Sequence, residues 1–203
     1  MGRLRLNTTM VKAGEELGRI HLSTYHATEF NPGMGAPTRF ALISDLDGNV
    51  IPTLYAGTSY MCATFEYLFH NIDAAGAFKS VALTTVDRLS YSRIAARRDL
   101  KLVRLFEHDL NKLQLTRADL IDTPASSYSQ TRLWAEAVHA QSDADGLMWT
   151  SRRCDPERAL ILFGDRVGGS DLTRMDSQPI LTSVSLFEQF QTFAEMAGIT
   201  LTS

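Results

Sequence analysis

The chain has 203 residues, of which 44% are hydrophobic and 9% aromatic, so it can bury the core of an ordinary globular domain. Its 20 basic and 23 acidic residues give a formal net charge of −3, which excludes the strongly basic field of a typical nucleic-acid-binding protein. No apolar run is long enough to span a bilayer, and the N-terminal segment has no signal-peptide core, so we expect a cytoplasmic protein. Two cysteines, Cys62 and Cys154, predict reduced thiols rather than a disulfide framework.

The first quarter of the chain predicts strands separated by turns. Residues 17–22 (LGRIHL) and 38–43 (TRFALI) are expected to be strands, with a loop rich in Gly and Pro between them. The DGN sequence at 47–49 is a turn signal, and another strand is expected over 50–56. The turn would join the second of these strands to the third as a hairpin.

A helix is predicted next, with Thr58 or Ser59 as its N-cap and Gly76 closing the segment. Its apolar residues recur at helical spacing: Met61, Phe65, Leu68, Phe69 and Ile72. Runs at 80–86 and 100–106 are then expected to be strands.

The second half of the chain predicts a helix over 129–141 and strands over 146–150 and 159–163. The last helix, 185–198, is the best marked, because Ser185 and Glu188 have the spacing of a capping box and Gly198 follows the apolar face. Strands and helices are interspersed without regular alternation. We therefore expect an α+β fold with a mixed or antiparallel sheet, in a single domain over 1–203.

The conspicuous acidic motif is DLDG, with Asp45 and Asp47. Haloacid-dehalogenase-type phosphatases place such a loop after a buried strand, where the first Asp attacks phosphorus, the second acts as acid or base, and Mg²⁺ screens the charge. Here some forty residues precede the loop, and the required lysine is hard to place, since Lys101 and Lys112 are the candidates. The competing and favoured interpretation is a hairpin turn that needs only residues tolerant of positive φ.

A second acidic feature is Glu66, alone in a strongly apolar stretch. On the predicted helix it lies at the flank of the apolar stripe, four residues from both Cys62 and His70. The simplest interpretation is a solvated glutamate, because Glu is rarely buried. A carboxylate beside an apolar stripe is otherwise costly unless it is paired or used in chemistry.

Six short motifs around Glu66 occur in a characteristic order. They are GRI (18–20), TRF (38–40), LYAGTS (54–59), ATFE (63–66), SQ (129–130) and DGLMWTS (145–151). In this order the chain resembles the RES domain family, named for its Arg, Glu and Ser, over about residues 17–163. It departs from the family pattern at Thr38, where glycine is usual, and in the length of 73–125, a region that could hold a specificity or partner surface.

The resemblance implies a fold similar to the ADP-ribosyltransferase toxins and an enzyme that consumes NAD⁺, with no metal and no further cofactor. It makes Glu66 the catalytic carboxylate under the ribose, and it assigns Arg19 and Arg39 to the pyrophosphate. Tyr55 would stack on the nicotinamide or line its pocket, and Ser151 would hydrogen-bond the ribose or orient the acceptor. Each assignment has a plainer alternative: a surface or ion-paired arginine, a core tyrosine, or a serine ending a strand. The pair Arg152-Arg153 is expected to be solvated.

The resemblance also implies a toxin of a toxin–antitoxin pair, blocked by a small antitoxin with a helix-turn-helix domain, with a homodimer as one possible assembly. The acceptor of the ADP-ribosyl group stays open between water, phosphate and a protein side chain. Two rival hypotheses remain: the Mg²⁺-dependent phosphatase using Asp45 and Asp47, and a non-catalytic binding module on the same fold.

Overall fold

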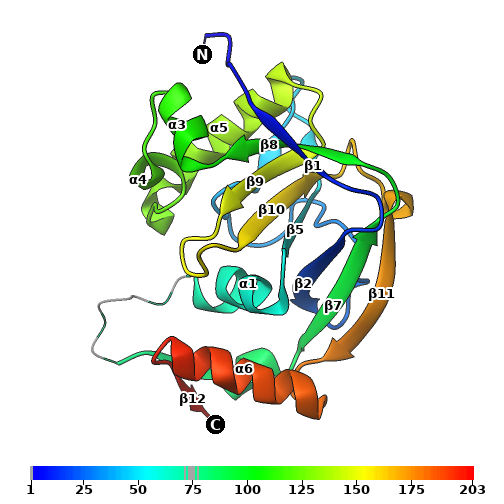
Figure 1. The fold of residues 1–203 in the computed structure, drawn as a ribbon, viewed down its shortest axis with the longest axis vertical. Coiled ribbons are helices and arrows are strands. Elements are labelled where there is room, and N and C mark those ends of the chain that lie inside the picture. Colours follow the sequence, from blue (N-terminus) through cyan, green and yellow to red (C-terminus); the bar gives the residue numbers. More distant parts are fainter. Residues whose placement is uncertain (1, 71, 73–75, 77) are drawn as a thin grey trace.

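A computed structural model describes residues 2–70, 72, 76 and 78–203 of the chain (Figure 1). Eight strands form one sheet: β1 (Thr8–Val11), β2 (Glu16–Leu22), β5 (Thr53–Gly57), β7 (Leu89–Ala96), β8 (Leu100–Leu105), β9 (Gly146–Thr150), β10 (Arg158–Phe163) and β11 (Leu172–Pro179). Their order in the sheet is β1-β8-β9-β10-β5-β2-β7-β11. Neighbours run antiparallel except β8 and β9, which are parallel, so the sheet is mixed. The predicted α+β class is confirmed.

Two short strand pairs lie outside this sheet. β3 (Ile43–Ser44) pairs antiparallel with β4 (Val50–Ile51), and β6 (Ser80–Ala82) pairs parallel with β12 (Thr200–Thr202) at the end of the chain. The parallel pair joins two segments that are far apart in sequence, and it lies beside the last helix (Figure 1).

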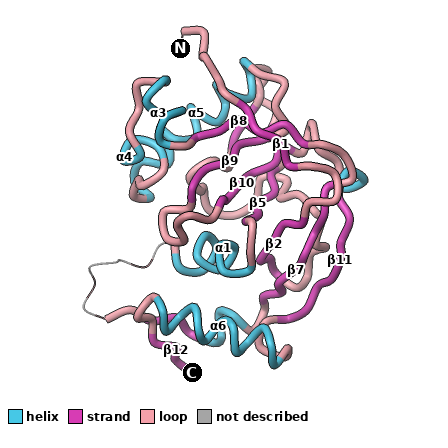
Figure 2. Tube along the Cα trace, viewed as in Figure 1, coloured by secondary structure: helices cyan, strands magenta, loops and turns pink. Residues whose placement is uncertain are grey.

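The helices lie along one side and the lower edge of the strands (Figure 2). They are α1 (Tyr60–Thr64), α2 (Leu83–Val86), α3 (Glu107–Lys112), α4 (Arg117–Leu120), α5 (Tyr128–Gln141) and α6 (Val184–Met196). A π-helical turn, Phe65–Phe69, continues α1 directly. Among the described helices, none has the length and apolar character needed to cross a bilayer.

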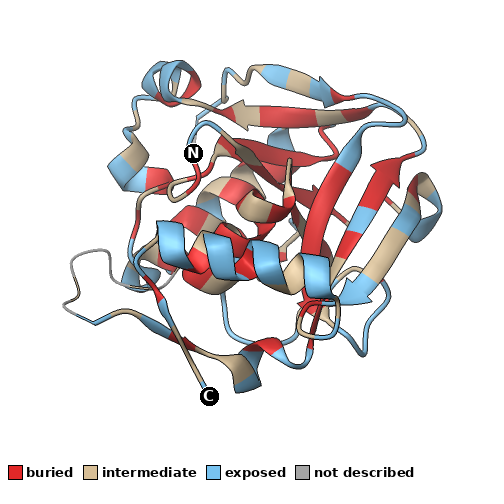
Figure 3. Ribbon diagram, turned by 60° about the horizontal axis from the view of Figure 1, so that its bottom comes forward, coloured by how far each residue is buried: buried red, intermediate tan, exposed pale blue. Residues whose placement is uncertain are grey.

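The core has two parts, one on each face of the curled sheet. The inner core lies between the strands themselves and includes Leu17, Leu54 and Leu160. The outer core lies between the sheet and the helices and includes Ile20 of β2 and Phe190 of α6. Because both faces are covered, β9 and β10 are buried along most of their length and read as continuous apolar runs. The outward side of α6 is exposed (Figure 3).

Two glycines allow α1 to approach the sheet closely. A Cβ on Gly18 of β2 would lie 2.8 Å from the carbonyl oxygen of Ser59, and one on Gly57 of β5 would lie 2.9 Å from Cys62 Sγ. Ser59 is the N-cap of α1, and its hydroxyl accepts a hydrogen bond from Cys62 N at 3.0 Å. The start of α1 is therefore set against the junction of β2 and β5, and the π-helical turn follows from there.

The structure corrects several predicted elements before residue 90. Residues 38–43 do not form a strand, since only Ile43 and Ser44 pair. The strand expected over 50–56 is broken at Pro52, which has no N–H to donate, into β4 and β5. The helix ends at Phe69 rather than near Gly76, although residues 71 and 73–75 lie outside the described part. The run 80–86 is β6 followed by the short helix α2.

The later predictions agree better with the structure. Strand β2, the N-cap Ser59, the helix α5 and the strands β8, β9 and β10 are confirmed within a residue or so. The capping box at the last helix is wrong: α6 begins at Val184 with Ser183 as N-cap, and no side chain caps it. Gly198 follows that helix with φ +65°, as expected for a C-terminal glycine. Both cysteines are free and buried.

A buried histidine joins β2 to β7. His21 Nδ1 donates to the carbonyl of Leu22 at 2.9 Å, and Nε2 is hydrogen-bonded to Ser92 Oγ at 2.7 Å. Burial lowers the pKa of His21 below its ordinary value, and the positive charge of Arg19 acts in the same direction. The imidazole is therefore neutral in the folded protein near pH 7.

Because the unfolded chain binds this proton more readily, the stabilisation is complete above the unfolded pKa of about 6.5 and is lost as the pH falls below it. We expect a lower melting temperature at pH 5.5 than at pH 7.5, measured by calorimetry. The pKa of His70 is lowered too, so the wild type is compared with His21→Gln, which should lose less stability over the same interval. An equal loss in both proteins would contradict this role for His21.

Candidate active site

Glu66 lies in the π-helical turn, seven residues after Ser59, the N-cap of α1. Its side chain is 13% exposed, so it is neither the solvated glutamate of the simplest interpretation nor fully enclosed. π-helical turns are rare and occur frequently at functional sites. The residues that contact the carboxylate therefore decide what role Glu66 can have.

Ser151 binds the carboxylate from the protein interior. Its hydroxyl donates to Glu66 Oε1 at 2.6 Å, and the serine is fully buried. Ser151 follows β9, where its backbone N–H donates to the carbonyl of Glu157 at 3.0 Å and so closes the loop between β9 and β10. A strand-end serine and a helical glutamate 85 residues apart in sequence thus meet. The bond fixes the orientation of the carboxylate.

Arg39 faces the other carboxylate oxygen. Its Nη1 lies 3.7 Å from Glu66 Oε2, and its side chain is 7% exposed. This separation is an ion pair but too long for a good hydrogen bond. The Nε atom is buried without a partner, and no hydrogen bond joins the guanidinium to any described residue. A buried arginine with unused donors beside a carboxylate calls for an explanation, and an anionic ligand supplies one.

Tyr55 is held against the same segment. Its hydroxyl accepts from the backbone N–H of Phe40 at 3.0 Å and shares a hydrogen bond of 2.8 Å with Thr38 Oγ1. Its ring meets Trp149 edge-on, with centroids 6.2 Å apart. Burial raises the pKa of Tyr55 to about 12, so the phenol stays protonated. The residue supports the Arg39 segment from β5, which favours the plainer interpretation of Tyr55 as a core tyrosine with a satisfied hydroxyl.

Arg19 is held by the loop that follows β2. Its Nη1 donates to the carbonyl of Ala27 at 2.6 Å, and burial lowers its pKa to about 10, against the opposing charge of Glu29. It is a buried residue rather than a surface one. In the described part of the chain, no hydrogen bond or ion pair joins it to Arg39, Glu66 or Ser151. Of the five predicted site residues, the structure joins Arg39, Glu66 and Ser151 by direct contacts and links Tyr55 to the Arg39 segment. Arg19 is bound to the Ala27 carbonyl instead, and its charge acts on Tyr67, the residue after Glu66.

Two residues that the motifs did not single out belong to the surroundings of the site. His70 lies four positions after Glu66, and its pKa is lowered, first by burial and then by the charge of Arg39, while the charge of Glu66 opposes the shift. The spacing of four residues from Glu66 is the sequence feature that could have indicated His70. Thr131 of α5 donates to the carbonyl of Arg39 at 2.5 Å. No pattern in the sequence indicates that contact, because it joins residues 92 apart.

Arg152 and Arg153 are not the solvated pair that we expected. Arg152 donates to the carbonyls of His70, at 3.0 Å, and of Asp122, at 3.2 Å. Arg153 donates to the carbonyl of Ile72. Both side chains are partly buried, and they attach the loop after β9 to the end of the π-helical turn. These bonds stabilise the segment that follows Glu66.

The DLDG motif forms the turn of the β3–β4 hairpin. Asp45 Oδ1 accepts from the backbone N–H groups of Asp47 at 2.9 Å and Asn49 at 2.8 Å, and Gly48 has φ +84°. The pKa of Asp45 is lowered most by the hydrogen bond that Asn49 Nδ2 donates to Oδ2 at 2.9 Å, and the backbone bonds act in the same direction. Within the described residues no group of three or more His, Cys, Asp or Glu side chains could hold a metal ion. Turn geometry accounts for the motif.

The comparison with known families agrees with this geometry. A family model described as the RES domain matches residues 16–181. The chain belongs to the RES domain family. The RES match is longer than the 17–163 expected from the motifs and includes all five predicted site residues. No curated protein matches the chain.

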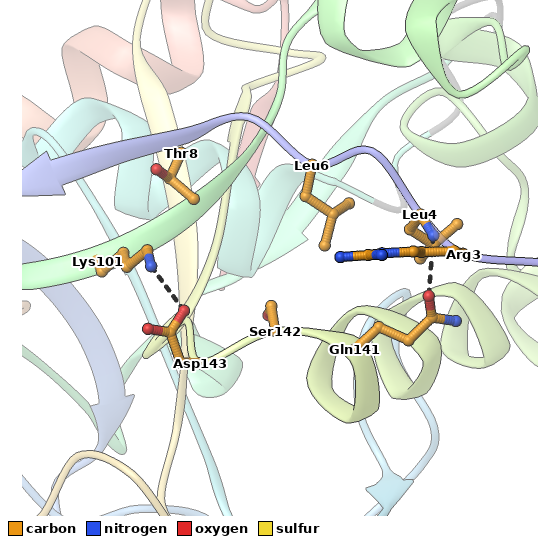
Figure 4. Close-up of a pocket in the computed structure, with 8 residues that line it drawn as sticks. All are labelled: Arg3, Leu4, Leu6, Thr8, Lys101, Gln141, Ser142 and Asp143. Atoms are coloured by element: carbon orange, nitrogen blue, oxygen red, sulfur yellow. Dashed lines mark hydrogen bonds and ion pairs between the residues drawn. The ribbon is translucent and has the colours of Figure 1, made fainter.

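A separate hollow lies between the N-terminal segment, which precedes the RES match, and the end of α5 (Figure 4). It measures about 450 Å³ and is lined in part by Arg3, Leu6 and Lys101. Lys101 is already paired with Asp143 at 2.6 Å. Neither Arg39, Glu66 nor Ser151 lines the hollow. The RES site is therefore identified by its buried charges rather than by this hollow.

Proposed function

We propose that this RES protein cleaves the bond between nicotinamide and ribose in NAD⁺, as a glycohydrolase or a phosphorylase. The observation that carries the proposal is the buried Arg39, whose Nε has no hydrogen-bond partner among the described residues, beside a Glu66 carboxylate held by Ser151. This arrangement pairs an anion-binding group with a carboxylate of fixed orientation. NAD⁺ carries a pyrophosphate and a ribose that match these two groups.

The chemistry follows from the transition state. Breaking the bond leaves a ribose with oxocarbenium character, as in glycoside hydrolysis. A carboxylate near the ribose stabilises the developing positive charge more than it stabilises the ground state, which raises the rate. Nicotinamide is a cationic leaving group in NAD⁺ and departs neutral, so no strong general acid is required.

Each site residue has a role in this proposal. Glu66 stabilises the developing cation, and Arg39 binds the pyrophosphate through charge-assisted hydrogen bonds. Ser151 orients the carboxylate, since its hydroxyl is already donated to Glu66. Arg19 is proposed to contact the pyrophosphate as well. NAD⁺ is the substrate, and no other cofactor or metal is proposed.

The family resemblance supports a further proposal about the biological setting. The protein would act as a toxin, and a helix-turn-helix antitoxin would bind it and cover the NAD⁺ site, with a toxin homodimer as one possible arrangement in that complex. We also propose, from the same family resemblance, that the fold is similar to that of the ADP-ribosyltransferase toxins.

The test is to incubate the purified protein with NAD⁺ and measure nicotinamide release with and without inorganic phosphate. Hydrolysis gives ADP-ribose, nicotinamide and a proton, whereas phosphorolysis gives ADP-ribose 1″-phosphate and nicotinamide. We expect release in at least one condition and equal release from Asp45→Asn, whose carboxyl only organises a turn. If nicotinamide appears only when a protein acceptor is present, the enzyme is an ADP-ribosyltransferase. If Asp45→Asn abolishes turnover, the assignment to Glu66 is wrong.

A further inference from the structure

The segment that carries Arg39 has no regular structure to hold it. Residues 38–42 lie outside every strand and helix, between the loop after β2 and the hairpin β3–β4. Within the segment, Thr38 Oγ1 donates to the carbonyl of Ala41 at 3.1 Å, and Arg132 Nη1 donates to the carbonyl of Leu42 at 3.2 Å. A guanidinium on such a segment needs support from neighbouring elements if it is to keep one position.

That support converges on a single peptide unit, the one between Arg39 and Phe40. Its carbonyl oxygen accepts from Thr131 Oγ1 of α5 at 2.5 Å. Its N–H donates to the Tyr55 hydroxyl of β5 at 3.0 Å. Both polar groups of this peptide are therefore bound by side-chain hydroxyls from elements far apart in the chain. The plane of the peptide immediately after the Arg39 Cα is fixed from two sides.

The hydroxyl of Thr131 makes this contact and one other hydrogen bond, within its own helix. It is fully buried, and its second acceptor, the carbonyl of Tyr128 at 3.2 Å, lies one turn earlier on its own helix. A valine would fill the same volume without placing a hydroxyl in the core. The hydroxyl is explained by the Arg39 carbonyl, which lies outside the helix.

We propose that Thr131 is a positioning residue, which together with Tyr55 sets the Arg39 guanidinium opposite Glu66. This inference rests on the proposed NAD⁺ cleavage and deepens it. The geometry that it explains is the 3.7 Å separation between Arg39 Nη1 and Glu66 Oε2. We call the hydrogen bonds that join Thr131 and Tyr55 to the peptide between Arg39 and Phe40 the clamp. A displacement of about 1 Å in such a guanidinium group costs up to about 100-fold in rate, so loss of the clamp should be measurable in catalysis.

The test compares Thr131→Val, which removes only the hydroxyl, with Thr131→Ser, which keeps it. We expect Thr131→Val to lower kcat/KM for NAD⁺ by about 30-fold, largely through KM because Arg39 binds the substrate, and Thr131→Ser to recover most of the loss. Tyr55→Phe should act in the same direction and serves if the valine variant folds poorly. In an Arg39→Ala background, Thr131→Val should have almost no further effect, because Thr131 acts through Arg39.

Hydrogen exchange of the 38–42 segment gives a readout that does not need NAD⁺. Exchange at the Phe40 amide should accelerate in Tyr55→Phe, and exchange over the segment should accelerate in Thr131→Val. Unchanged exchange overturns the clamp, as does a full kinetic loss that persists in the Arg39→Ala background. If the wild type releases no nicotinamide, the proposed function is wrong, and so is the proposal that the clamp positions Arg39 for NAD⁺. Hydrogen exchange still decides whether the clamp holds the 38–42 segment.

Discussion

Replacing Glu66 by glutamine is expected to lower kcat/KM for NAD⁺ cleavage by about 1000-fold while the protein stays folded, a loss of the size seen when one preorganised electrostatic group is removed from a site. Glutamine has nearly the same shape and keeps an oxygen for the Ser151 hydroxyl, which donates at 2.6 Å. It lacks the negative charge that would stabilise the ribosyl cation. Nicotinamide release measures the rate, and calorimetry checks that the melting temperature is retained.

The matched control for this variant is Glu188→Gln on α6, which removes the same charge from an exposed helix position. It should leave both the rate and the melting temperature unchanged. A Glu66→Gln enzyme with more than about a tenth of the wild-type kcat/KM would contradict a charge-stabilising role for Glu66. Turnover would then have to depend on another group near the site.

Replacing Gly146 by alanine is expected to cost about 3 kcal/mol of stability, at the upper end of ordinary single substitutions. Gly146 lies in β9 between β8 and β10, paired with Leu102 on one side and Leu162 on the other. A Cβ there would lie 2.0 Å from the carbonyl oxygen of Ile161 and 3.0 Å from Leu162 Cα. Backbone atoms of a central strand cannot move away as a flexible side chain would. The strand pairing itself must therefore shift.

The loss would appear as a melting temperature lower by about 6–12 °C in calorimetry, or as a lower midpoint in urea. Gly168→Ala is the matched control, because the nearest atom to its Cβ would be Ser170 Oγ at 3.5 Å, an ordinary contact. That variant should stay within about 0.5 kcal/mol of the wild type. Equal stability of the two variants would show that the β9–β10 pairing is looser than the structure indicates.

Elements with strong local signals could be predicted from the sequence. Strands β9 and β10 are apolar runs because both of their faces are covered, and Ser59 is an N-cap because its hydroxyl meets a free helix N–H. Strand β11 was not predicted, because it is an edge strand in which polar residues predominate and half of the residues are exposed. Strand β7 was also missed, since buried Ser90 and Ser92 interrupt its apolar pattern. The strand expected at 38–43 does not form, because side chains of Tyr55, Thr131 and Arg132, rather than a neighbouring strand, bind backbone polar groups within residues 39–42.

The family could also be recognised from the sequence, and the match over 16–181 confirms it. The ordered motifs marked Glu66, Ser151 and Arg39 as members of one site, and the turn chemistry of Asp45 argued against the phosphatase. The role of each side chain was less accessible. The motifs predicted Ser151 as a catalytic residue beside Glu66 and Arg39, and Tyr55 as a binding residue. The hydroxyls of Ser151 and Tyr55 are, however, already hydrogen-bonded within the protein.

The sequence by itself determined the family, the α+β class and the residue types available for catalysis, because these depend on local patterns and on the order of motifs. Only the tertiary structure decided that Glu66 meets Ser151 and Arg39. It also decided that Thr131 and Tyr55 hold one peptide unit between them. The physical reason is that these contacts join segments 15 to 92 residues apart, and hydrogen bonds between such segments are set by packing.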